Sequence, residues 1–485
     1  MGDVTVRGLV ALEDLPPSTP ILSVPVSSTL RDDRAAEAYP GAPWNANLAA
    51  QLLQEREKGS ASAFAPYIAT LPESCCSPLL LQEHQLHEVQ YGPAMDAIAA
   101  YRQSVRAAYD SCCAVRAAAG QQQFSWQEWA WAVHMVQSRS IRLAITGCKV
   151  MIPGIDLLNH GGSAANGQLV LGKASWQLEG EPAVCFVTSS HIPAGQQVLW
   201  SYGTRGNDDY FVYHGFALPH NPDEDVVLFE DVQQLLAWAL QRLPQLQPLA
   251  AAGWEQQQQL AAVAEAAATR AAQEASAFCS SGAIQGTSSS TLLPLHSLTQ
   301  QLKQPPSRQQ QQAQQQWQQQ LGRSGGSGAV CEAAVLSGMK YLKLHRRLAS
   351  CRLHSASWGT PDCPQTIPEL VLRCDGCIDV RLPAVMAALL DAAAAAPGSS
   401  SSSSAGQQAG LFVEQLPALL QQLVQMRCQE LLEAFPSGIE QDDVWLMQQQ
   451  QQAGQGSEAD WLMAAVVHYR RAKKQVLRDQ AACQL

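Results

Sequence analysis

Two short polar clusters carry the side chains that are placed to do chemistry. The first is Asn159-His160, which ends an apolar segment beginning at Val150. The second is Tyr202, which follows the β-prone run 198–200 and precedes Gly203, where the chain can turn sharply. An amide, an imidazole and a phenol at the ends of apolar segments can bind a polar ligand and contact the group that reacts. These residues therefore predict a ligand-binding pocket.

The same stretch resembles the SET-domain methyltransferases, in the branch that includes the Rubisco large-subunit and actin-histidine methyltransferases. The resemblance rests on Asn159-His160, on Ser201-Tyr202-Gly203, on Asn207 and on the closing Gly215-Phe216. It implies S-adenosylmethionine as the cofactor, a protein as the methyl acceptor and a reaction that needs no metal. Methyl transfer to nitrogen is an in-line displacement, which requires a neutral nitrogen about 3 Å from the methyl group and the exclusion of water.

The resemblance also assigns roles to particular residues. Tyr202 is the expected catalytic residue, whose hydroxyl would orient the target nitrogen and stabilise charge near the sulfonium without acting as a strong base. Substrate binding is expected from Arg139, Asp156, Tyr202 and Tyr213. Cofactor binding is expected from Thr5, Val6, Arg7, Arg139, Asp156, Leu157, Leu158, Asn159, His160, His214, Gly215 and Phe216. Val6 stands where the family has a glycine.

The acceptor is predicted to be a lysine on a non-histone protein, with two alternatives. The run Tyr202–Asn207 resembles the actin-histidine branch, but that branch carries an asparagine and a tryptophan where this chain has Ile141 and Ile155. An imidazole needs polar and aromatic partners to fix its ring, whereas the aliphatic stem of lysine suits an apolar channel. Protein-histidine methylation is the first alternative, and a SET scaffold that binds a partner without catalysis is the second.

Short strands and helices must position these residues. The segment 5–30 indicates two strands around a Pro-rich turn, and alternating residues between Gln168 and Tyr202 indicate further strands. The segment 124–140 has the apolar spacing of a helix. These patterns, with the resemblance, predict an α+β protein with a β-rich SET fold that has small sheets and the pseudoknot of the family. Its expected parts are an N-terminal part at 1–44, a helical insert at 45–145 and a C-terminal part with the catalytic motifs at 146–229.

Residues 230–485 are predicted to form an all-α domain that resembles the substrate-binding domain following SET in this branch. Tracts rich in Gln, Ser and Gly lack the apolar content to fold, which predicts disordered inserts at about 255–328, 397–410 and 448–456. The last helix is expected to present a solvated basic face formed by Arg470, Arg471, Lys473, Lys474 and Arg478.

Composition and charge indicate which partners, metal sites and compartments are expected. A formal charge of −11 weighs against nucleic acid or an anionic membrane as the main partner. No run approaches the ~18 apolar residues of a membrane span, and no targeting segment is seen. The 14 cysteines are scattered, and Cys374 and Cys377 have no second pair at zinc-site spacing, which predicts reduced thiols and no metal site. A cytoplasmic protein is expected, with the chloroplast stroma or the nucleus as alternatives.

Overall fold

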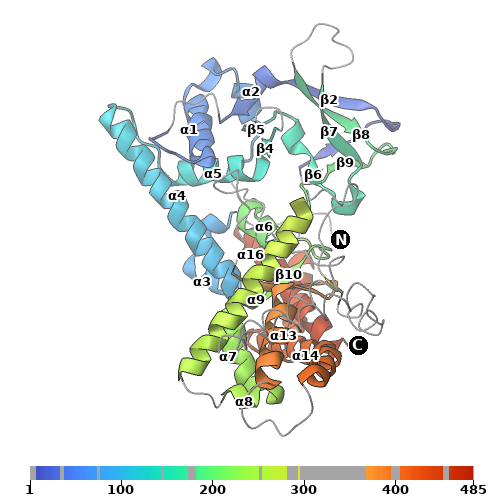
Figure 1. Ribbon diagram of the computed structural model, residues 1–485. Coiled ribbons are helices and arrows are strands. Elements are labelled where there is room, and N and C mark those ends of the chain that lie inside the picture. Colours follow the sequence, from blue (N-terminus) through green and yellow to red (C-terminus); the bar gives the residue numbers. More distant parts are fainter. Residues whose placement is uncertain are drawn as a thin grey trace. The chain divides into compact units, whose positions relative to one another are not determined.

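The computed structural model describes residues 7–32, 38–73, 77–143, 147–172, 182–250, 254–280, 293–294, 368–394, 405–451 and 458–483 (Figure 1). The chain forms two compact units. The first comprises Met1–Asn221 and Ser437–Ala472, and the second comprises Pro222–Pro436 and Lys473–Leu485. No helix among the described residues combines the length and the apolar character that a membrane crossing requires.

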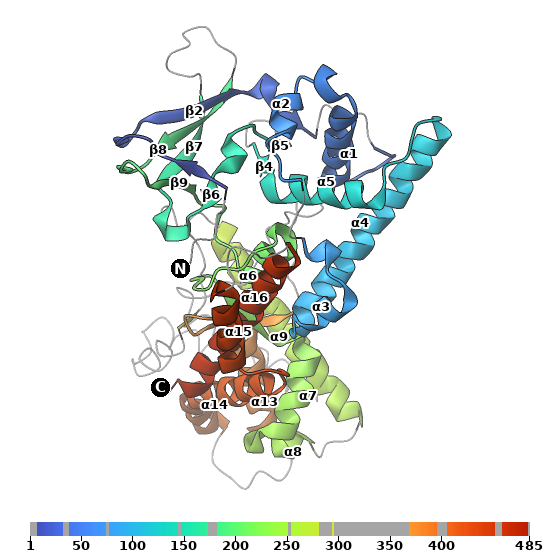
Figure 2. The ribbon, with the colours of Figure 1, turned by 180° about the vertical axis from the view of Figure 1, so that it is seen from behind.

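Three small sheets form the β part of the first unit. One sheet orders β1 (Leu9–Val10), β9 (Gln197–Trp200) and β6 (Asn159–His160), with β6 parallel to β9. The second orders β2 (Pro20–Pro25), β8 (Ala183–Thr188) and β7 (Gly167–Gly172), so that a blue strand lies beside two green ones (Figure 2). The third orders β3 (Leu30–Arg31), β5 (Lys149–Met151) and β4 (Ile141–Arg142). Because β6 and β9 are neighbours, the two polar clusters of the sequence meet at one end of the first sheet.

Helices complete the first unit. They are α1 (Trp44–Glu57), α2 (Ala65–Ile68), α3 (Glu83–His87), α4 (Gly92–Ala118), α5 (Trp126–Arg139), α6 (Asn207–Asp209), α15 (Ile439–Gln451) and the first part of α16 (Glu458–Ala482). The predicted helix at 124–140 is confirmed as α5, whose start is fixed by a reciprocal capping box between Ser125 and Glu128. Trp129 is fully buried on this helix, which packs beside α1 in both views (Figures 1 and 2). The burial of α5 fixes the position of its last residue, Arg139.

The second unit packs helices against a short sheet. The sheet orders β10 (Asp225–Phe229), β12 (Leu370–Arg373), β13 (Cys377–Ile378) and β11 (Leu293–Pro294). The helices are α7 (Val232–Arg242), α8 (Gln247–Ala250), α9 (Trp254–Ser280), α13 (Arg381–Ala394) and α14 (Ala405–Glu433). Their apolar faces share one core with Val226 and Leu228 of β10. The domain predicted to be all-α therefore contains a four-stranded sheet.

The prediction of a disordered insert beginning near residue 255 is wrong for its first part. Residues 254–280 form α9, where Leu260, Ala264 and Ala268 are buried in the core of the second unit. Alanine has the highest helix propensity, and these small side chains allow close packing against α13. Residues 405–410 begin α14 and residues 448–451 end α15, so those inserts are shorter than predicted. The rest of all three inserts, apart from the two residues of β11, lies outside the described residues.

The predicted domain boundaries also need correction. The first unit ends at Asn221 rather than at residue 229, and residues 437–472 belong to it rather than to the C-terminal domain. Tyr469 of α16 stacks on Phe211 with ring centroids 4.6 Å apart, and Arg470 donates to Asp442 over 2.9 Å. These contacts hold the C-terminal helices within the first unit.

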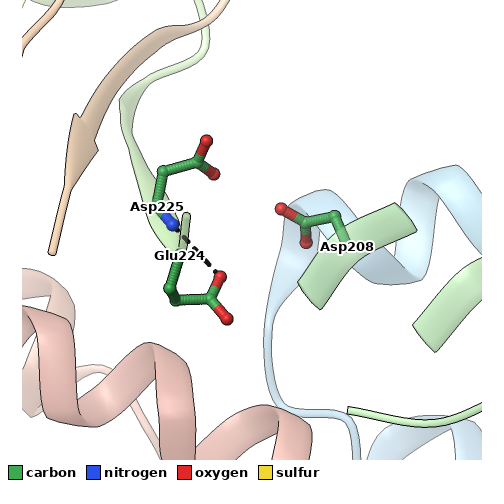
Figure 3. Close-up of side chains that lie close together, drawn as sticks. All are labelled: Asp208, Glu224 and Asp225. Atoms are coloured by element: carbon green, nitrogen blue, oxygen red, sulfur yellow. Dashed lines mark hydrogen bonds between the residues drawn. The ribbon is translucent and has the colours of Figure 1, made fainter. Parts of the chain in front are cut away.

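The basic face of the last helix is largely buried rather than solvated as predicted. Arg470 is 6% exposed, and Lys473 and Lys474 are fully buried. In the second unit, the Lys473 Nζ donates to Glu224 Oε1 and to the backbone oxygen of Asp225, both over 2.7 Å. Glu224 also accepts the backbone N–H of Asp225 over 3.1 Å (Figure 3). Carboxylates that are distant in the sequence allow these basic side chains to be buried.

Candidate active site

The turn that carries Tyr202 is fixed by a chain of hydrogen bonds. The Tyr202 backbone N–H donates to His160 Nδ1 over 3.0 Å, so the His160 ring carries its hydrogen on Nε2. That nitrogen lies 3.3 Å from the Tyr210 hydroxyl, which in turn donates to the Gly203 carbonyl over 2.8 Å. Gly203 adopts φ +105°, a conformation that disfavours any side chain. The motif histidine therefore acts by orienting the tyrosine turn.

The Tyr202 side chain is half-buried and surrounded by aromatic rings. Its ring centroid lies 5.2 Å from that of His160, 5.8 Å from that of His214 and 6.5 Å from that of Phe216. Its hydroxyl donates to the Leu158 carbonyl over 2.7 Å. Burial is the main cause that raises the pKa of Tyr202 to about 12. The phenol therefore stays protonated at neutral pH, with its hydrogen directed at Leu158 and its oxygen lone pairs left to contact a ligand.

His214 and Phe216 lie beside Tyr202 at the end of a π-helical turn, Tyr210–His214. The turn ends at Gly215, which has φ +79°. The His214 ring hydrogen-bonds to the backbone of Ser138, and no described atom pairs with its buried Nδ1. The ring is therefore a neutral imidazole with a free acceptor nitrogen. Burial, followed by the positive charge of Arg205, lowers the pKa of His214 to about 3. His214 thus offers a ligand a hydrogen-bond acceptor without a charge.

Arg139 and Asp156 form a second polar group of the site, together with Tyr67 of α2. Arg139 Nη1 donates to the backbone oxygen of Asp156 over 2.9 Å and lies 3.4 Å from Oδ2. The Tyr67 hydroxyl donates to the same Oδ2 over 2.8 Å. The Asp156 side chain is 1% exposed, and its Oδ1 has no partner among the described residues. Burial raises the pKa of Asp156, although Arg139 and Tyr67 favour its charged form.

The segment just before β1, which contains the predicted cofactor-binding residue Arg7, contacts Asn159. The Asn159 Nδ2 donates to the Arg7 carbonyl over 3.2 Å and to Gln197 Oε1 over 3.1 Å. A Cβ at position 8 would lie 2.5 Å from this Nδ2, so Gly8 permits the close approach. Thr5 and Val6, which were predicted to bind the cofactor, lie outside the described residues.

Other predicted residues take positions around this centre. Leu157 ends a 3₁₀ turn that begins at Ile155, and Ile155 is buried in the apolar core beside the sheets. Tyr213 packs its ring edge-on against Tyr101 of α4, with centroids 5.1 Å apart. Ile141 is half-buried against the same core as Ile155. The role predicted for Tyr213 in substrate binding stays a prediction.

Sequence reasoning missed Tyr67 and Tyr210. Tyr67 lies in the helical insert, and nothing in the local pattern of that segment indicates a partner 89 residues away. Tyr210 could have been noticed, because it lies four residues before His214 on a short helical segment.

We expect the first unit to lose stability as the pH falls from about 6.5 towards 4. Burial lowers the pKa of His134 to about 4 and that of His214 to about 3. Both rings are neutral in the folded protein, whereas the unfolded chain takes up their protons below about pH 6.5, which favours unfolding by up to about 1.4 kcal/mol per pH unit for each ring. The midpoint of thermal unfolding should therefore drop between pH 7 and pH 5. A His134→Gln variant should show a smaller drop, and an equal drop would contradict this origin.

Comparison with known proteins shows which family the region of the three sheets and the Tyr202 turn resembles. Residues 6–203 match the family model of the SET domain. The actin-histidine N-methyltransferases of Homo sapiens and Mus musculus are 29% identical to this chain over 193 residues. The alignment covers 38% of this chain and 31% of each relative, so the matched region spans about a third of the length of these curated relatives.

Two solved structures share the fold. The SET domain of LSMT bound to lysine and AdoHcy superposes with a TM-score of 0.51, and Rubisco LSMT bound to sinefungin and monomethyllysine with a TM-score of 0.50. Each is 16% identical to this chain, and each superposition covers 99% of this chain and 85% of the other. The predicted resemblance to the SET branch and the predicted α+β SET fold are both confirmed.

Proposed function

We propose, since the chain carries a SET domain, that it is an S-adenosylmethionine-dependent protein N-methyltransferase that acts on lysine. The observation that carries this proposal is the arrangement around Tyr202. A protonated phenol stands among His160, His214 and Phe216, and its hydrogen is already committed to Leu158. An oxygen held in this way can accept an N–H from the target nitrogen and stabilise positive charge near a sulfonium.

The residues present fit the cofactor. Asp156 Oδ1 and His214 Nδ1 are buried acceptors with no partner among the described residues, and a ligand that carries amino groups would satisfy such atoms. The rings of Tyr202 and Phe216 suit both a cation and a flat heterocycle. S-adenosylmethionine supplies an activated methyl group on a cationic sulfur. We assign its binding to Arg7 and Asn159, to Asp156 and to the turn at His214–Phe216.

The protein's own contribution is orientation rather than proton abstraction. Tyr202 cannot act as a base at neutral pH, because burial holds its pKa at about 12. Its oxygen instead fixes where the acceptor nitrogen lies, and the His160–Tyr210–Gly203 chain of hydrogen bonds fixes the turn that carries it. Rigid positioning of this kind lowers the entropic barrier of a displacement that needs near-linear geometry.

Two apolar residues of the chain favour lysine over histidine as the methyl acceptor. Ile141 and Ile155 replace the asparagine and tryptophan expected in a histidine-directed site, and both isoleucines pack in the apolar core. Histidine is a second candidate, which is supported by the names of the curated relatives. Because those relatives match only part of this chain, their names do not decide the acceptor.

The test is methyl transfer into a soluble cell extract with labelled S-adenosylmethionine, followed by mass-spectrometric mapping of the labelled residue. We expect label on lysine. Label on histidine would overturn the choice of acceptor but retain the enzyme class. Cofactor binding without transfer to any extract, including one from the source cells, would favour a binding scaffold over an enzyme.

A further inference from the structure

Two like charges lie directly opposite each other on the sheet β3–β5–β4 of the first unit. Arg142 of β4 pairs with Lys149 of β5, so the two side chains point to the same face of the sheet. On the other side of β5, the Asp32 backbone N–H donates to the Lys149 carbonyl over 3.1 Å. The row across this face therefore reads Asp32, Lys149, Arg142. Like charges in directly opposed positions destabilise a strand pair.

Among the described residues, this row holds two cations and one carboxylate. Burial is the first cause that lowers the pKa of Lys149 to about 8, and the charges of Arg142 and Arg205 lower it further, although Asp32 opposes them. Lys149 Nζ lies over the ring of Trp44, 4.9 Å from its centroid. Arg142 is exposed, and NH1 donates to the Gly147 carbonyl, which carries no formal charge. The row can thus accept a further anion.

Arg205 connects this row to the catalytic turn. Its Nε donates to the Tyr202 carbonyl over 3.3 Å, and the positive charge of its guanidinium acts on both Lys149 and His214. Asp209 Oδ2 lies 3.8 Å from Arg205 Nη1. This separation leaves the ion pair weak. Arg205 therefore lies at the turn that carries Tyr202, and its charge reaches Lys149, the strand partner of Arg142, in a chain whose formal charge is −11.

We propose that Arg142, Lys149 and Arg205 form a docking surface for acidic side chains that flank the methylated residue of the protein substrate. This inference rests on the proposed function, because it takes the Tyr202 turn as the place where the acceptor residue enters. An acidic peptide fits better than a nucleic acid, because the basic surface is small and the remainder of the chain is acidic, which repels a long polyanion. The surface selects among exposed acceptor residues by charge.

The experiment compares two fluorescent peptides with a central lysine in a Gly/Ser background. One carries two glutamates on each side of the lysine, and the other carries glutamines at the same positions. Binding is measured by anisotropy in the presence of S-adenosylhomocysteine, and kcat and KM for methylation are measured on the same peptides. We expect roughly fivefold tighter binding of the acidic peptide at low salt, a smaller preference at physiological salt, and a difference in KM rather than in kcat.

The variant Arg142→Gln/Lys149→Gln should abolish the preference and leave the affinity for S-adenosylmethionine unchanged. The matched control is Arg106→Gln/Lys58→Gln, which removes one charge from α4 and one from the residue that follows α1, and it should keep the preference. Equal affinity of the wild-type protein for the two peptides, with methylation intact, would overturn the docking surface alone. Methylation absent while acidic binding persists would overturn the proposed function alone. Tighter binding of a single-stranded oligonucleotide than of the acidic peptide would overturn the choice of partner.

Discussion

Replacement of Tyr202 by phenylalanine is expected to lower the rate of methyl transfer by about 100-fold, with little change in cofactor affinity. The substitution removes only the hydroxyl, because the ring can keep its contacts with Trp200 at 5.5 Å and with His214 at 5.8 Å. In the proposed mechanism the lost oxygen holds the acceptor nitrogen, so the loss should appear in kcat. Transfer of labelled methyl groups at saturating cofactor measures this effect.

The matched control is Tyr109→Phe on α4. That hydroxyl also donates to a backbone carbonyl, the oxygen of Phe124 over 3.0 Å, but it lies in the helical insert and outside the site. We expect its transfer rate to equal that of the wild-type protein. A Tyr202→Phe variant with full activity would contradict the catalytic role, whereas a variant that no longer binds S-adenosylmethionine would show that the hydroxyl holds the pocket together.

Replacement of Lys473 by methionine is expected to lower the free energy of unfolding by about 3–5 kcal/mol. Lys473 is fully buried, and its Nζ bonds to Glu224 Oε1 and to the Asp225 carbonyl, both over 2.7 Å. Methionine fills a similar volume but removes the ammonium group that faces the Glu224 carboxylate, whose side chain is 4% exposed. The cost therefore comes from the loss of this ion pair by a buried carboxylate. Chemical denaturation of the full chain measures it.

Two further variants separate charge from packing. Lys58→Met removes an exposed lysine that pairs with Glu55 over 2.6 Å, and it should cost less than about 1 kcal/mol. The double variant Lys473→Met/Glu224→Gln removes both charges of the buried pair and should recover part of the lost stability. A double variant that is less stable than Lys473→Met alone would contradict the assignment of the cost to the Glu224 carboxylate.

Much of the candidate site follows from the sequence because its residues lie in short motifs. Asn159-His160 and the Tyr202 turn are each local, and the pairing of β6 with β9 brings them together. Arg139 is assigned to the site by the family resemblance, and the structure places it as the last residue of α5. The contact between Tyr67 and Asp156 depends on how the insert folds back, and no local pattern encodes that distance.

The wrong predictions about the fold also have physical causes. Gln- and Ala-rich residues after 254 look too polar or too small to form a core, yet Leu260 and the alanines of α9 pack into one. The many basic residues of α16 predict a helix face that is exposed to solvent. Lys473 and Arg470 are instead buried by the carboxylates of Glu224 and Asp442, which lie 249 and 28 residues away in the sequence. Contacts between residues distant in sequence, rather than local composition, determine the burial of these segments.

Calorimetric titration of the wild-type protein with S-adenosylmethionine tests the central claim most directly. The proposed cofactor site at Tyr202, Asp156 and His214 predicts one binding site per chain with micromolar affinity, retained in Tyr202→Phe and weakened in Asp156→Ala. Absence of binding by the folded wild-type protein would contradict the cofactor pocket, and with it the proposed methyl transfer.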